Sequence, residues 1–124
     1  MNQQEKRLVL MVEDNKNVHQ LLEFALRAHQ DKYLLISAHT LESGQKLFRK
    51  YREHIHVVIL DASLDPRCEL DTIPLLEEIV ASDFTGAIIA SSSSRAHRQT
   101  MMRSGCTRDC EKSRLIDLLK EDSF

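Results

Sequence analysis

The chain of 124 residues is 42% hydrophobic and 29% charged, which fits one compact globular domain, residues 1–124, and excludes a disordered or fibrous chain. Its net charge of -2 and dispersed basic residues exclude the Lys/Arg stripe with which proteins neutralise a nucleic-acid backbone. No apolar run approaches the roughly 20 residues of a membrane span, and residues 1–7 are too polar for a signal region, so we expect a cytoplasmic protein with no membrane contact.

The first half of the chain predicts strands and helices in alternation. Residues 8–12 form a continuous apolar run, typical of a strand buried on both faces, that stops at Glu13 and Asp14. From Val18 onward apolar residues, Leu21 among them, recur at helical spacing, which predicts an amphipathic helix with His19 at a polar position. Residues 33–38 predict the next strand. Residues 40–43 then resemble a capping box that opens a helix through residue 51, with Ser as the fourth residue.

The second half continues the alternation. Residues 56–60 are apolar and rich in β-branched side chains, and this predicted strand ends on Asp61. A loop at residues 62–72, which contains Pro66, leads to a helix at residues 74–80, and residues 87–90 predict a short strand. A helix from residue 95 to about 103 ends at Gly105. Residues 106–112 form the weakest strand pattern because they are polar, and Ser113 is the predicted N-cap of a last helix at residues 114–121.

Alternating strands and helices of ordinary length predict an α/β fold, in which right-handed crossovers place helices on both faces of a parallel sheet. Ligands bind such sheets beyond the carboxyl ends of the strands, where the strand order reverses. Glu13, Asp14 and Asp61 all lie at the carboxyl ends of predicted strands. We therefore expect these three side chains to meet at one edge of the sheet.

These acidic residues suggest a chemistry. Carboxylates that converge repel one another unless a cation joins them, so we expect a hard divalent ion with oxygen ligands, Mg²⁺. With the cation present, Asp61 could attack phosphorus and form an acyl phosphate. Ser91 after the fourth predicted strand and Lys112 after the fifth would supply a hydroxyl and an ammonium to the phosphate. The order and spacing of these residues, rather than any one alone, carry the hypothesis.

The sequence resembles the response-regulator receiver (CheY-like) family over nearly its whole length. The resemblance lies in the segments LVLMVEDN, VVILD, IIASS and GCTRDCEKS. It implies a flavodoxin-like, doubly wound parallel sheet of five strands in the order 2-1-3-4-5, with the site between the first and third strands. It also implies a two-component signalling role, in which a histidine kinase or phosphotransfer protein phosphorylates the chain in the presence of Mg²⁺. By this resemblance Asp61 would be the phosphoacceptor, Glu13, Asp14, Asp61 and Ser63 would hold the metal, and Ser91 and Lys112 would contact the phosphoryl group.

Several features depart from the family's pattern. Ser113 follows the lysine, where the family usually has a proline after a cis peptide bond. A cis bond before a non-proline residue costs about 3 kcal/mol, so we expect a trans bond, which could displace the ammonium. Asp109 stands where the family commonly has a Tyr or Phe that moves inward on activation, so coupling to the output should use other groups, such as the loop at residues 91–94. The loop after Asp61 looks about three residues longer than usual and lacks the family's Gly.

Other interpretations remain open. A pseudo-receiver would keep the fold but act as a protein-interaction module without phosphorylation, and Asp109 and Ser113 favour it. An enzyme is not expected, because aspartate-nucleophile phosphatases carry a second Asp where this chain has Ser63. The cysteines form no CxxC pair, which favours free thiols in a reducing compartment. As partners we expect a phosphoryl donor, a downstream protein target that the sequence does not identify, and at most a weak homodimer through the short last helices.

Overall fold

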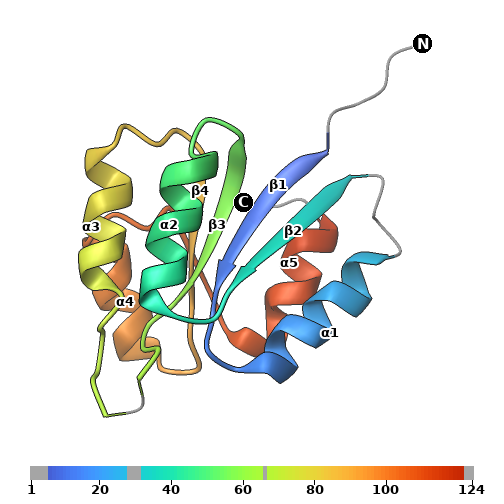
Figure 1. Cartoon of the computed structure of the whole chain (residues 1–124). Coiled ribbons are helices and arrows are strands. Elements are labelled where there is room, and N and C mark those ends of the chain that lie inside the picture. Colours follow the sequence, from blue (N-terminus) through green and yellow to red (C-terminus); the bar gives the residue numbers. More distant parts are fainter. Residues whose placement is uncertain (1–5, 28–31, 66, 122–124) are drawn as a thin grey trace.

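The computed structural model describes residues 6–27, 32–65 and 67–121. Pro66 and residues 1–5 of the polar N-terminal segment lie outside the described part. Strands and helices alternate along the chain (Figure 1). The strands are β1 (Arg7–Val12), β2 (Tyr33–Ala38), β3 (Ile55–Asp61), β4 (Ala87–Ser91) and β5 (Arg108–Cys110). The helices are α1 (Lys16–Leu26), α2 (Leu41–Tyr51), α3 (Ile73–Ala81), α4 (Arg95–Arg103), the 3-10 turn η2 (Lys112–Arg114) and α5 (Leu115–Glu121).

The five strands form one parallel sheet in the order β2-β1-β3-β4-β5, which confirms the α/β fold and its strand order. Helices α1 and α5 cover one face of the sheet, and α2, α3 and α4 cover the other (Figure 1). The strand order reverses between β1 and β3, where such sheets bind their ligands. In the register of β3 and β4, Asp61 is paired with Ser91 at the carboxyl ends of the two strands.

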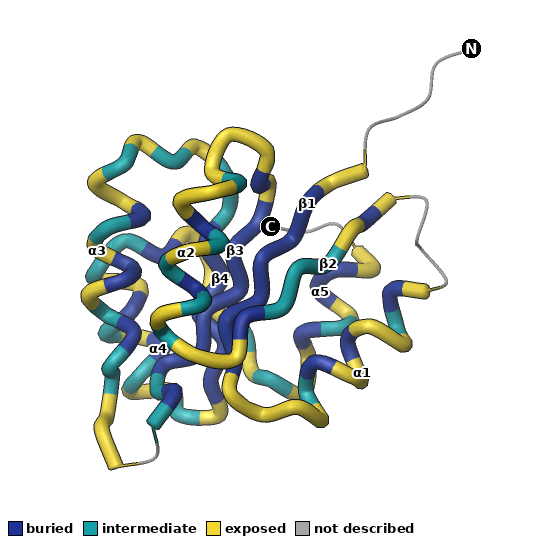
Figure 2. Tube along the Cα trace, viewed as in Figure 1, coloured by how far each residue is buried: buried dark blue, intermediate teal, exposed yellow. Residues whose placement is uncertain are grey.

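The strands pack into two hydrophobic cores, because successive side chains of a strand point to opposite faces of the sheet. From β1, Leu10 and Val12 pack with Phe48 of α2 in one core, while Met11 packs with Leu22 of α1 in the other. Figure 2 shows β1, β3 and β4 almost entirely buried. Burial on both faces explains why these strands appear in the sequence as continuous apolar runs without polar alternation.

Helix α2 begins with the predicted capping box. Thr40 Oγ1 accepts a hydrogen bond from the Ser43 backbone N–H (3.1 Å), and Ser43 Oγ accepts one from the Thr40 N–H (3.2 Å). Ser43 is thus the fourth residue of the capping box, a position that Glu or Gln occupies more often. Helix α4 ends as expected near Gly105, whose φ of +122° is strained for any residue with a Cβ.

The prediction for the start of the last helix is wrong. Lys112 to Arg114 form the 3-10 turn η2, and α5 begins only at Leu115. Ser113 therefore lies inside the turn, and the extended residue before the turn is Glu111, which makes no side-chain cap. Tighter 3-10 turns are frequent at helix ends, and the spacing of apolar residues does not distinguish them from α-helix.

The polar position predicted for His19 on α1 is also wrong. His19 is 3% exposed, whereas Leu21 of the predicted apolar face is 62% exposed. His19 Nε2 forms a hydrogen bond with the backbone oxygen of Glu13 (2.6 Å), whereas the buried Nδ1 has no hydrogen-bond partner in the described structure. The ring lies against the ring of His39. A polar side chain can be buried when it has such a partner, and periodicity alone does not reveal the partner.

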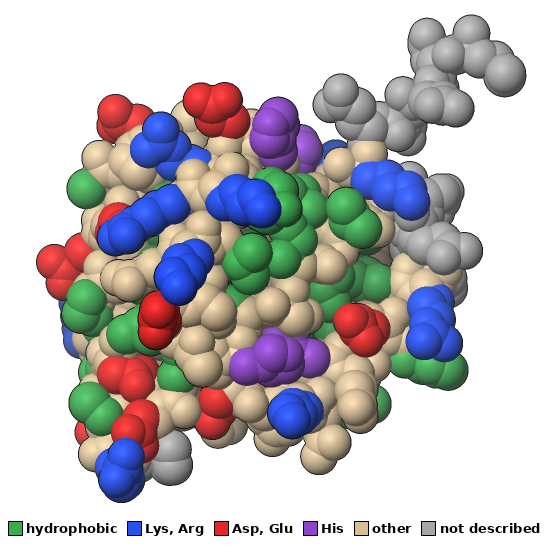
Figure 3. Space-filling model, viewed as in Figure 1, with side chains coloured by type: hydrophobic (Ala, Val, Ile, Leu, Met, Phe, Trp, Pro, Cys, Tyr) green, Lys and Arg blue, Asp and Glu red, His purple; other side chains and the backbone are tan. Residues whose placement is uncertain are grey.

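Basic and acidic side chains lie close together over α2 and α3 (Figure 3). Arg49 of α2 donates two hydrogen bonds to the carboxylate of Glu78 on α3 (3.0 and 2.6 Å), and Lys46 forms an ion pair with Glu42. Within residues 6–27, 32–65 and 67–121, no helix has both the length and the apolar character needed to cross a membrane.

Candidate functional site

Carboxylates from two adjacent strands meet at the carboxyl edge of the sheet, as the sequence predicts. Glu13 and Asp14 follow β1 directly, and Asp61 is the last residue of β3. One oxygen from each of the three side chains lies within 4.8 Å of the others. Glu13 and Asp61 are buried, and Asp14 is exposed. In the described part of the chain this is the one group of three or more His, Cys, Asp or Glu side chains placed to hold a metal ion.

The crowding of these carboxylates changes their acidity. Burial is the main reason that the pKa of Glu13 lies above its ordinary value, and the neighbouring Asp61 adds to the rise, while Lys112 opposes it. The pKa of Asp14 is also raised, first by desolvation and then by Glu13. The site thus holds more negative charge than its protein environment stabilises.

Lys112 supplies positive charge to this site from the turn after β5. Its Nζ lies 2.8 Å from Glu13 Oε1 and donates a hydrogen bond to Asp61 Oδ2 (3.2 Å). Burial lowers the pKa of the Lys112 ammonium, but Glu13 and Asp61 outweigh this effect and raise the pKa above its ordinary value. The bond to Ser113 is trans, as predicted, and the ammonium nevertheless reaches the carboxylates.

Two hydroxyl groups predicted for the site differ in their surroundings. Ser91 is 1% exposed, and its Oγ is buried without a hydrogen-bond partner in the described structure, at the end of β4 next to the end of β3. Ser63 Oγ, in contrast, accepts a hydrogen bond from the Leu70 N–H (2.9 Å), which folds the long loop back toward Asp61. Asp61 itself is held by the Ala62 N–H, which donates to Oδ1 (2.8 Å).

An open cavity of about 360 Å³ lies over these groups. It is lined by Asp14, Asp61, Ala62, Ser63, Glu69, Ser92, Ser93, Ser94, His97 and Lys112. Asp61 can therefore be reached by a ligand or a partner side chain. The cavity is rich in hydroxyl and charged groups, as a phosphate site requires.

Sequence reasoning missed three residues of this site. Glu69 and His97 line the cavity together, with 3.9 Å between Glu69 Oε2 and His97 Nε2. His97 lies in the first turn of α4, three residues after the N-cap Ser94, so the predicted helix start could have indicated it. His19, which bonds the backbone of Glu13, is the third, and its sequence position beside apolar residues gives no comparable signal.

No family model matches this sequence, and no curated protein is similar enough to count as a relative. Comparison of structures is more informative. The signal receiver domain of a response regulator from Bermanella marisrubri superposes with a TM-score of 0.76 at 18% identity, covering 95% of this chain and 95% of that one. This chain has the receiver-domain fold.

Other solved structures support the same receiver fold. The chemotaxis protein CheY4 of Vibrio cholerae matches with a TM-score of 0.75 at 17% identity, covering 95% of this chain and 96% of that one. A chain from the co-crystal structure of the Saccharomyces cerevisiae phosphotransfer protein Ypd1 with the receiver domain of Ssk1 gives a TM-score of 0.73 at 21% identity, over 94% of this chain and 86% of that one. Another neighbour, from Vibrio parahaemolyticus, is the signal receiver domain of a putative LuxO repressor protein, with a TM-score of 0.74 at 20% identity over 95% of this chain and 87% of that one.

Proposed function

We propose that this receiver fold, as one domain of residues 1–124, is a phosphoacceptor switch of a two-component or phosphorelay pathway, with Asp61 as the acceptor. The observation that carries the proposal is the setting of Asp61, a buried carboxylate that faces an open cavity with Glu13, Asp14 and Lys112 around it. The proposal places the protein in the cytoplasm, a reducing compartment where its cysteines, which are free thiols in this structure, would stay reduced.

The residues at the acidic edge fit Mg²⁺. Carboxylate oxygens are hard ligands of the kind that this ion prefers. One oxygen each of Glu13, Asp14 and Asp61 lies within 4.8 Å of the others, which is close enough for the three carboxylates to share one ion. Glu13 Oε1 is buried and has the Lys112 ammonium 2.8 Å away as its cationic partner. Glu13, Asp14, Asp61 and Ser63 would hold the ion, which neutralises charge on phosphoryl oxygens when bound.

In the transfer step an Asp61 carboxylate oxygen forms a bond to the phosphorus of a phosphohistidine. The bond between phosphorus and the donor's imidazole nitrogen breaks, and the imidazole keeps that electron pair and takes a proton from water. Lys112, which already contacts Asp61, would pair with one phosphoryl oxygen, and Ser91 would donate its hydroxyl to another. The buried, unpartnered hydroxyl of Ser91 thereby acquires an acceptor.

The proposed phosphoryl donor is a histidine kinase or a phosphotransfer protein. The support comes from the structural neighbour Ssk1, whose receiver domain was crystallised with the histidine phosphotransfer protein Ypd1. The phosphorylated surface would then bind a downstream protein, as signalling by charge-changing modification requires.

The test is to incubate the wild type and the Asp61→Asn variant with acetyl phosphate and Mg²⁺ and to measure the intact masses. We expect the wild type to gain the mass of one phosphoryl group, and we expect EDTA and Asp61→Asn each to abolish the gain. Asp65→Asn, on the same loop and half-exposed, is the matched control and should be phosphorylated as the wild type is. Absence of any gain that depends on Asp61 would overturn the proposal and favour a protein-interaction module, the function that Asp109 and Ser113 suggest.

A further inference from the structure

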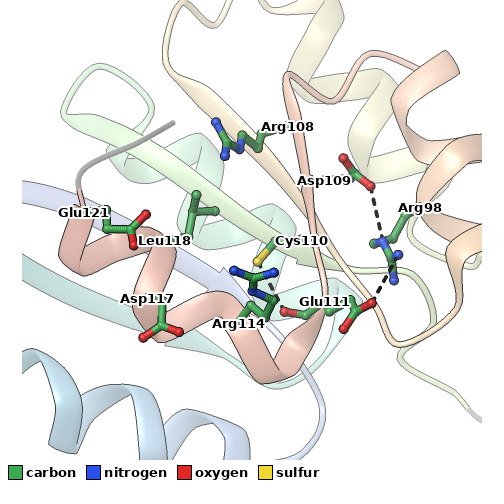
Figure 4. A pocket seen from close by; sticks show the side chains of 9 residues that line it. All are labelled: Arg98, Arg108, Asp109, Cys110, Glu111, Arg114, Asp117, Leu118 and Glu121. Atoms are coloured by element: carbon green, nitrogen blue, oxygen red, sulfur yellow. Dashed lines mark hydrogen bonds and ion pairs between the residues drawn. The ribbon is translucent and has the colours of Figure 1, made fainter.

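Arg98 of α4 is a buried cation that joins three segments of the chain. Its side chain is 9% exposed. Nη1 donates a hydrogen bond to the backbone oxygen of Ser92 (2.7 Å), and Nε donates one to Asp109 Oδ2 (3.3 Å). Nη2 lies 3.9 Å from Glu111 Oε1. Figure 4 shows the guanidinium between the side chains of Asp109 and Glu111.

These contacts depend on one another energetically. A buried guanidinium is costly unless charged or polar partners compensate it, and removing one partner leaves the charge poorly satisfied. Arg98 has one partner in the loop after β4 and the other two on and just after β5. The position of the loop at Ser92 and the position of the β5 carboxylates are therefore linked through a single side chain.

The loop end of this link lies at the phosphoacceptor site. Ser92 follows Ser91 directly, and it lines the cavity over Asp61. Its backbone N–H donates to the Cys110 oxygen of β5 (3.3 Å), so the loop touches β5 through the main chain as well. The planar peptide unit between Ser91 and Ser92 joins the Ser91 carbonyl carbon to the Ser92 Cα, so a movement of the Ser91 backbone displaces Ser92, whose carbonyl oxygen is bonded to Arg98.

We propose that Arg98 is the positioning residue that couples the phosphorylation state of Asp61 to the surface formed by α4 and β5. When Asp61 carries a phosphoryl group, Ser91 moves to donate its unpartnered hydroxyl to it, the Ser92 carbonyl moves with it, and Arg98 exchanges part of its contact with Ser92 for its carboxylate partners. This inference rests on the proposed function. It gives the chain an ionic connection at Asp109, the position where the family that the sequence resembles commonly has a Tyr or Phe.

The other end of the link is exposed to a partner protein. Asp109 and Glu111 are half-exposed, and with Arg98, Arg108 and Arg114 they line a cavity of about 300 Å³ beside β5 (Figure 4). A change in the pairing of Arg98 alters the charge distribution and the mobility of this surface. The signal thus appears outside the phosphoacceptor site without the movement of an aromatic ring.

The test compares amide hydrogen exchange with and without acetyl phosphate, at constant Mg²⁺, in the segments at residues 91–94 and 108–111. In the wild type we expect phosphorylation to change exchange in both segments. In Asp109→Ala and in Arg98→Gln we expect the phosphorylation-dependent change in exchange at residues 108–111 to be reduced by at least about fivefold. The change at residues 91–94 should stay as it is in the wild type. Asp109→Ala leaves Arg98 its contacts with Ser92 and Glu111, so this variant should fold even if loss of the buried Arg98 itself prevents folding.

The matched control is Glu78→Ala, which breaks the ion pair with Arg49 between α2 and α3, away from this path. It should respond as the wild type does. An unchanged response at residues 108–111 in Asp109→Ala, or an equal loss in Glu78→Ala, would overturn the coupling role. Measurement of the intact mass distinguishes this inference from the proposed function. If Asp61 is phosphorylated but hydrogen exchange at β5 does not change, only the coupling role of Arg98 is wrong. If no phosphorylation occurs, both proposals are wrong.

Discussion

Lys112 Nζ donates a hydrogen bond to Asp61 Oδ2 over 3.2 Å, although 51 positions separate the two residues in the sequence. The bond joins the end of β3 to the turn after β5, across the intervening strand β4. Lys112 is the one Lys or Arg among the described residues that line the cavity over Asp61. The balance of charge in the site therefore depends on this side chain until a divalent cation binds.

Replacement of the lysine tests that balance. Lys112→Gln leaves Glu13 and Asp61 buried without a cationic partner, so we expect the free energy of unfolding at pH 7 without divalent ions to fall by about 1–3 kcal/mol. Urea unfolding measures it. Lys46→Gln, which removes an exposed ion pair with Glu42, is the control and should cost under about 1 kcal/mol. Equal effects of the two substitutions would contradict the role given to Lys112.

The pH dependence of stability follows from the raised pKa of Glu13. An acid with a raised pKa in the folded state binds its proton more tightly there than in the unfolded chain. Its stabilising effect is complete below the ordinary value of 4.5 and is lost as the pH rises through the folded-state pKa. In the absence of divalent ions, the free energy of unfolding of wild type relative to Glu13→Gln should therefore decrease as the pH rises above about 4.5. Urea midpoints measured across this range check it, and a constant or rising difference would contradict it.

Magnesium should stabilise the folded chain, because the carboxylates that form its site are brought together only by folding. At a free concentration about one hundred times the dissociation constant, the gain is about 2.7 kcal/mol. Thermal unfolding at increasing Mg²⁺ concentration should show a rising midpoint for the wild type and a much smaller rise for Asp14→Asn. Glu42→Gln removes an exposed carboxylate on α2 that neither lines the cavity over Asp61 nor belongs to the acidic group, so this variant should behave as the wild type does. A uniform response of all three proteins would indicate nonspecific binding.

Ser91→Ala separates a structural role from a functional one. Because the Ser91 hydroxyl is buried and unpartnered, its removal should leave the free energy of unfolding within about 1 kcal/mol of the wild type, or raise it. Phosphorylation by acetyl phosphate should nevertheless slow several-fold, as followed by intact mass over time. Ser37→Ala is the matched control, since its hydroxyl is also buried and unpartnered but lies on β2. A Ser91→Ala variant that is phosphorylated at the wild-type rate would remove Ser91 from the phosphate site.

The sequence alone determined the parts of the fold that depend on neighbouring residues. Strands buried on both faces appear as apolar runs, and the predicted strand at residues 33–38 and the Thr40 capping box coincide with the structure. The acidic edge also followed from the sequence, because parallel strands bring their carboxyl ends together and Glu13 and Asp61 occupy those ends. These features can be predicted from the local sequence pattern together with the rule that the carboxyl ends of parallel strands lie at the same edge of the sheet.

The tertiary structure decided what depends on contacts between distant residues. The polar segment Arg108–Cys110 is a strand because its backbone pairs with β4, although its side chains give little sign of it. His19 is buried because the Glu13 backbone oxygen accepts its hydrogen bond, and Arg98 is buried because Ser92 and Asp109 satisfy its charge. The stability of a buried polar group depends on its partner, and a partner far along the chain comes into reach only when the fold has formed.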